Sequence, residues 1–94
     1  MDELERAARA KELLESLMFK EAHSAVRNEL ISAIETVPAT DFERMQEIVL
    51  SLQIHNRLKK KLERWVDDGK VEQKALDQAK WREDMIARAR KVWG

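Results

Sequence analysis

The sequence has no cysteine or tyrosine, and only two glycines and one proline in 94 residues. The absence of cysteine excludes disulfide bridges, thiolate nucleophiles and cysteine-based metal sites. Scarce glycine and proline, together with 38% charged residues, argue against sandwiches, barrels and βαβ units and predict long helices. A chain this short is expected to form a single helical domain, 1–94, whose thin core a partner surface could complete.

Long apolar runs are also missing. No stretch approaches the ~18 apolar residues that a membrane-spanning helix needs. The acidic start, with Asp2, Glu3 and Glu5, is unlike the cationic start of a signal peptide. We therefore expect no membrane partner and, because cysteine is absent, a protein of a reducing compartment.

Charge is balanced over the whole chain but not between its halves. Residues 1–47 hold 6 basic and 11 acidic side chains, a net charge of −5, whereas residues 48–94 hold 12 and 7, a net charge of +5. Such a dipolar chain suits head-to-tail or antiparallel self-association. The alternative is that these charges form pairs three and four residues apart on solvated helix faces.

Apolar residues recur at helical spacing and predict an all-α fold. We expect an elongated antiparallel helical hairpin of about 17–36 and 41–67, with an N-terminal helix before it and a C-terminal helix, about 71–92, after it. The second helix of the hairpin would be about 40 Å long, well over the ~26 Å diameter of a compact domain of this size. Residues 70–94 could dock separately as a helical arm.

Three local signals set the expected boundaries. Ser16 is a suitable N-cap, which favours a break there, although no proline or glycine excludes a continuous helix. Pro38 should end the preceding helix at about Thr36. Thr40, with a glutamate three residues later, has the order of a capping box, and Gly69 suits the left-handed residue that closes a helix.

Two apolar stripes run along residues 41–67. The first faces the preceding helix, and it makes Leu52, together with Val26 on that helix, an expected core residue. The second stripe needs the last segment or another subunit to cover it. With two tryptophans near the C-terminus it forms the candidate oligomer interface, whose members are Leu50, Ile54, Leu58, Trp65, Trp81 and Trp93.

The residues offer no catalytic, cofactor-binding or metal site. Neither His23 nor His55 belongs to a Glu-x-x-His or His-Glu-x-x-His motif, and no serine lies in a strand–turn–helix elbow. We expect a protein without enzymatic activity and without a cofactor. His55 lies within the first apolar stripe and should be hydrogen-bonded and half-buried; a polar interface position and a metal ligand are the alternatives.

One dense basic run, residues 57–64, holds five positive charges in eight residues. On a helix, four of them share one face: Arg57, Lys60, Lys61 and Arg64. This face is the candidate surface for a partner or for nucleic acid. The alternatives are that this face binds an acidic protein, which could be the acidic half of this chain, or that it only faces solvent. Nucleic acid is not favoured, because the chain is neutral overall.

Four segments share a pattern with a known group of proteins: Arg9–Glu15 (RAKELLE), Leu17–Ala22 (LMFKEA), Leu58–Glu63 (LKKKLE) and Asp68–Val71 (DGKV). On these segments, residues 3–76 resemble small α-helical proteins encoded in the virion-structure regions of tailed bacteriophages, near terminase, portal and capsid genes. Members of that group often carry proline and an aromatic residue where this chain has Leu17 and His23.

The resemblance implies a non-enzymatic phage structural or assembly protein. Such a protein would be an oligomeric helical component at the portal, capsid or packaging machinery, with other phage structural proteins as partners, in the virion or the host cytoplasm. One alternative is a nucleic-acid-binding packaging factor of small-terminase type that uses the basic face of residues 57–64. Another is a phage-encoded inhibitor of a host protein, whose acidic first half mimics nucleic acid.

Overall fold

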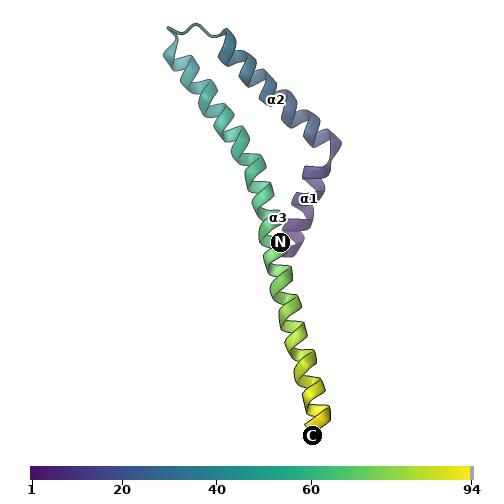
Figure 1. Ribbon diagram of the computed structural model, residues 1–94. Helices are drawn as coiled ribbons and strands as arrows, with labels where there is room; N and C mark the ends of the chain where they lie inside the picture. The colour runs from purple at the N-terminus through teal and green to yellow at the C-terminus, as the bar shows by residue number, and fades with distance from the viewer. Residues whose placement is uncertain (94) are drawn as a thin grey trace.

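The computed structural model describes residues 1–93, which form three helices and no strand (Figure 1). Helix α1 spans Glu3–Glu15, α2 spans Leu17–Thr36, and α3 spans Phe42–Trp93. The molecule measures 81 × 26 × 19 Å, and its radius of gyration of 22.6 Å far exceeds the ~12 Å of a compact chain of this length. The prediction of an all-α, elongated helical hairpin is confirmed.

Ser16 separates α1 from α2. Its backbone is extended, with φ −64° and ψ 126°, and its hydroxyl accepts a hydrogen bond from the Phe19 backbone N–H at 3.3 Å. This side chain satisfies one of the donors that a helix start leaves without a partner. The break that the sequence favoured at this position is therefore present, although neither proline nor glycine is there.

Pro38 and Asp41 define the turn between α2 and α3. Helix α2 ends at Thr36, as predicted, because the residue before proline is extended. Asp41 caps α3 and Thr40 does not: the Asp41 carboxylate accepts from the Arg44 N–H at 3.2 Å. The capping-box prediction was wrong by one residue, because a turn bond from the Asp41 N–H to the Pro38 carbonyl, 2.9 Å long, places Asp41 at the cap.

The helix end expected at Gly69 does not occur, and the two helices predicted at 41–67 and 71–92 are one continuous helix, α3. Gly69 has no positive φ. It is buried against α1, where an added β-carbon would overlap the Cβ of Ala7 and lie 3.7 Å from the Glu3 carbonyl oxygen. This glycine permits close helix packing; it does not close a helix.

The core is small and lies mainly between α1 and α3. Among the described residues, the buried apolar side chains are Ala10, Ile48 and Leu62. Ile48 and Leu62 lie on the first apolar stripe of residues 41–67, but Leu62 packs against α1 and not, as predicted, against the preceding helix. Leu52, an expected core residue, is half-buried. Helix α2 leans away from α3 along its middle and has no buried residue (Figure 1). Val26, an expected core residue, is therefore 43% exposed.

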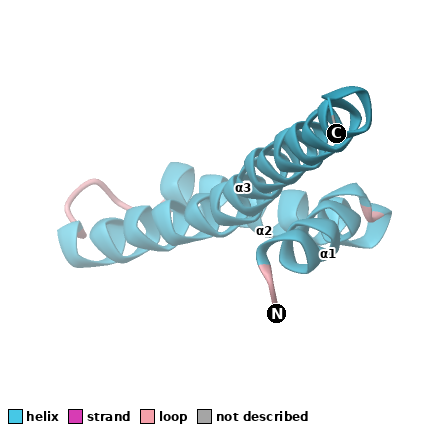
Figure 2. Cartoon of the chain, turned by 90° about the horizontal axis from the view of Figure 1, so that it is seen from below, coloured by secondary structure: helices cyan, strands magenta, loops and turns pink. Residues whose placement is uncertain are grey.

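The C-terminal part of α3 extends past α1 as a single helix (Figures 1 and 2). Every residue from 73 to 92 is exposed. We call residues 71–92 the C-terminal arm. The accessible surface of the chain is 8020 Å², against roughly 5600 Å² for a compact monomer of 11 kDa. The fold thus leaves much more surface in solvent than a compact domain does.

Candidate interaction surfaces

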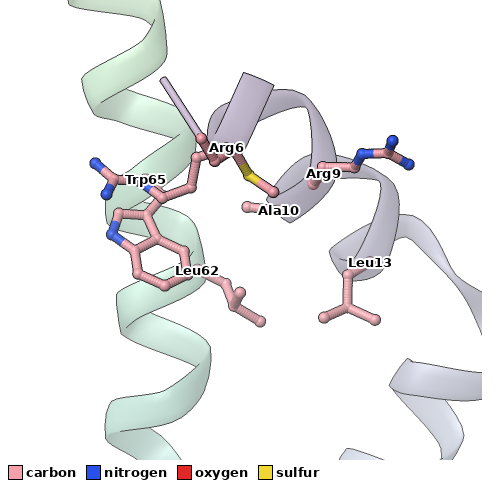
Figure 3. Close-up of a pocket in the computed structure, with 7 residues that line it drawn as sticks. Arg6, Arg9, Ala10, Leu13, Leu62 and Trp65 are labelled. Carbon is pink, nitrogen blue, oxygen red and sulfur yellow. The ribbon is translucent and has the colours of Figure 1, made fainter. Parts of the chain in front are cut away.

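An open apolar hollow of about 220 Å³ lies where α1 meets α3 (Figure 3). Leu13 and Leu62 line it from the two helices, and the Arg6 side chain crosses the ring of Trp65, with its guanidinium carbon 5.0 Å from the ring centre. This cation–π contact joins α1 to α3. Trp65, predicted in the oligomer interface, is therefore half-buried within its own chain.

A pair of stacked histidines joins α2 to α3. The rings of His23 and His55 stack with centroids 3.9 Å apart, and the His55 Nε2–H donates to the His23 backbone carbonyl at 2.9 Å. Phe19 lies next to His23, with 5.6 Å between ring centroids. The prediction that His55 is hydrogen-bonded and half-buried is confirmed.

The surroundings of His23 disfavour its protonated form. Burial lowers its pKa below the ordinary value of 6.5, and the nearby His55 lowers it further, with smaller contributions from Lys59 and Arg27. The Nε2 atom of His23 is buried and has no hydrogen-bond partner among the described residues. A proton on this ring would therefore be poorly solvated and close to other positive groups.

We expect the free energy of unfolding to fall as the pH is lowered below 6.5. Below pH 6.5 the unfolded chain takes up a proton on His23, whereas the folded chain does so only at the lower pKa of the folded state. The stability that this histidine contributes is therefore full above pH 6.5 and is lost as the pH falls to the folded-state pKa. Urea denaturation between pH 7.5 and 5 measures this slope. The His23→Phe variant keeps an aromatic ring between Phe19 and His55 and should show a smaller slope; an unchanged slope would contradict the assignment.

Apart from Trp65, the second apolar stripe remains uncovered by this chain. Leu50, Ile54 and Leu58 are 50%, 65% and 55% exposed, and Trp81 on the arm is 64% exposed. The structure places Trp81 far along α3 from the other three, so they do not form one patch within a single chain. The side chain of Trp93 lies outside the described residues. These exposures are consistent with an interface, which stays a prediction.

The four basic residues that share one face of the 57–64 run, Arg57, Lys60, Lys61 and Arg64, are all exposed on α3. An open hollow of about 440 Å³ beside them is lined by Lys60 and Arg64, and also by Glu63, Asp67 and Asp68. Acidic side chains thus follow the basic ones within one turn. The surface has mixed charge, which is less suited to a phosphate backbone than the four basic positions alone.

Sequence reasoning missed three contacts between distant segments: Arg6 with Trp65, Ala7 with Gly69, and His23 with His55. The sequence did contain a signal for the contact of Ala7 with Gly69, since a glycine within a helical pattern often marks close backbone approach. Nothing in the local pattern shows which residues of α1 and α2 meet α3. These contacts depend on the angle at Ser16, which the sequence does not specify.

Among residues 1–93, no group of three or more histidine, aspartate or glutamate side chains is arranged to hold a metal ion. Within the same residues, no helix is long and apolar enough to span a membrane. The fold and these surfaces define an elongated all-α protein with uncovered apolar helix faces. No known protein family, curated protein or solved structure matches the chain.

Proposed function

We propose that this protein is a non-enzymatic assembly protein, an oligomeric helical component of a bacteriophage particle. The observation that carries the proposal is the uncovered apolar surface on an 81 Å rod with three buried apolar side chains. Large exposed apolar side chains gathered along one face of a helix are typical of sites of protein association. A single copy leaves them in water, and neighbouring copies or other particle proteins would bury them.

The phage context of the proposal rests on the resemblance of residues 3–76 to helical proteins of virion-structure gene regions. An elongated helical rod suits a component that bridges or lines larger structures at the portal, capsid or packaging machinery. The chemistry of the surface supports protein partners, because exposed apolar residues lie beside mixed charges. Mass spectrometry of purified phage particles would test whether the protein is part of them.

Self-association is the first consequence to measure. We expect an oligomer in sedimentation experiments at micromolar concentration, since the interface would remove exposed leucine, isoleucine and methionine side chains from water. Met85→Glu should weaken it, because Met85 is 45% exposed and apolar. Gln73→Glu, at another exposed arm position, serves as the matched control. A folded monomer at 100-fold higher concentration would contradict the proposal.

A further inference from the structure

We infer that a second copy of this chain covers the exposed side of α3 in an antiparallel arrangement. The C-terminal arm of each copy, residues 71–92, then lies on residues 47–68 of α3 of the other. This inference rests on the proposed self-association and specifies its geometry. It follows from the pattern of one exposed stripe along the whole of α3, from the charge at its two ends and from the extent of exposed surface.

The stripe alternates steps of four and three residues, the spacing of a helix seam that contacts another helix. Its members are Leu50, Ile54, Arg57, Lys61, Arg64, Asp68, Val71, Ala75, Gln78, Arg82, Met85, Ala89 and Val92. All of them are exposed except Asp68, which is half-buried. Because this spacing is slightly shorter than the helical repeat, two such helices would wind around each other with a left-handed supercoil.

Apolar residues gather at the two ends of the stripe, and charged residues occupy its middle. Leu50 and Ile54 form one apolar end, and the other, from Val71 to Val92, is mostly apolar but includes Gln78 and Arg82. Between them, the stripe carries three basic residues: Arg57, Lys61 and Arg64. Any arrangement of two copies must therefore bring apolar ends together without stacking basic residues on each other.

An antiparallel arrangement meets this condition better than a parallel one. In a parallel, in-register pair, each of Arg57, Lys61, Arg64 and Arg82 would face its own copy. In an antiparallel pair with its two-fold axis between residues 69 and 70, Ile54 lies opposite the partner's Met85 and Leu50 opposite the partner's Ala89. Only Arg57 and Arg82, each opposite the other residue of the partner, then face a like charge, against four residues in the parallel pair.

The same register brings opposite charges together at the ends. The start of α3 and its cap hold three acidic residues, Asp41, Glu43 and Glu47, against one basic residue, Arg44, which pairs with Glu47 at 3.2 Å. The end of the arm holds three basic residues, Arg88, Arg90 and Lys91. In this register Glu47 lies opposite the partner's Val92, next to these basic residues, whereas Asp41 and Glu43 lie outside the overlap.

The surface that the chain exposes is large enough for this contact. Residues 47–92 would overlap over about 69 Å, at the rise of an α-helix. The accessible surface, 8020 Å², exceeds that of a compact monomer by roughly 2400 Å², and a stable interface needs about 800 Å² from each partner.

Because the chain has no cysteine, introduced cysteines can test the register directly. We would prepare Ile54→Cys and Met85→Cys as full-length variants; both positions are exposed, so neither change touches the core. Under mild oxidation, an equimolar mixture should form a disulfide-linked pair at least tenfold faster than either variant alone. Ile54→Cys mixed with Lys80→Cys, which lies off the stripe, is the matched control and should cross-link no faster than the single variants.

The outcomes separate the inference from the proposal on which it rests. Fast cross-linking of each variant with itself would show a parallel pair and overturn the inference. A wild-type oligomer in which the mixture cross-links no faster than the control would also overturn it, while leaving the proposed assembly role intact. A wild-type monomer in sedimentation experiments would remove both.

Discussion

Replacing Leu62 by alanine is expected to lower the free energy of unfolding by about 2–4 kcal/mol. Leu62 is only 7% exposed and lines the contact between α1 and α3 together with Ala10 and Leu13 (Figure 3). Because the core has so few buried side chains, its neighbours have little apolar material with which to refill the space. The loss should therefore lie within the range typical of core truncations and represent a large part of the total stability.

Chemical denaturation at a low, fixed protein concentration measures this effect without a contribution from association. Leu17→Ala is the matched control, since Leu17 is the same residue type but 70% exposed, and its cost should stay below about 0.5 kcal/mol. Equal losses at the two positions would mean that α1 does not pack on α3 through Leu62.

The boundaries that depend on neighbouring residues could be predicted from the sequence. Ser16 separates α1 from α2 because its hydroxyl accepts a hydrogen bond from the Phe19 backbone N–H, three residues later. Pro38 ends α2 because its ring restricts the residue before it. In both cases the cause lies within one turn of the residue, so the local pattern was sufficient.

Periodicity predicted which face of each helix is apolar, but not whether another helix covers that face. Val26 and Ile48 both lie on regular apolar stripes, yet Val26 is 43% exposed and Ile48 only 4%. The difference arises from the angle between α2 and α3, because α2 diverges from α3 away from the turn that joins them (Figure 1). Such an angle depends on the packing of segments far apart in the sequence, which a local pattern does not contain.

Gly69 shows how one local signal can have two causes. Glycine favours both a left-handed helix end and the close approach of another backbone. A local pattern does not distinguish them, because the deciding neighbour, Ala7, lies 62 positions earlier in the chain. The continuous α3 follows from the second cause, and so does the projection of the C-terminal arm.

Gly69→Ala is expected to lower the free energy of unfolding by about 1–3 kcal/mol, as overpacking of a tight contact does. In an isolated helix the same change would stabilise by about 1 kcal/mol, because alanine is the better helix former. Here the new methyl group would overlap the Cβ of Ala7, an atom fixed to the backbone that cannot rotate away. The helices must therefore separate, and the burial of Ala10 and Leu62 is reduced with them.

The double variant Ala7→Gly with Gly69→Ala tests this cause, because it removes the methyl group that the new one would strike. It should recover part of the lost stability, giving a favourable coupling energy between two positions that are in contact. Ala79→Gly on the exposed arm provides the reference cost of a glycine in α3 without a packing partner. If Gly69→Ala instead stabilises the protein by about 1 kcal/mol, helix propensity alone acts at this position. In that case α1 does not approach α3 closely enough to require glycine.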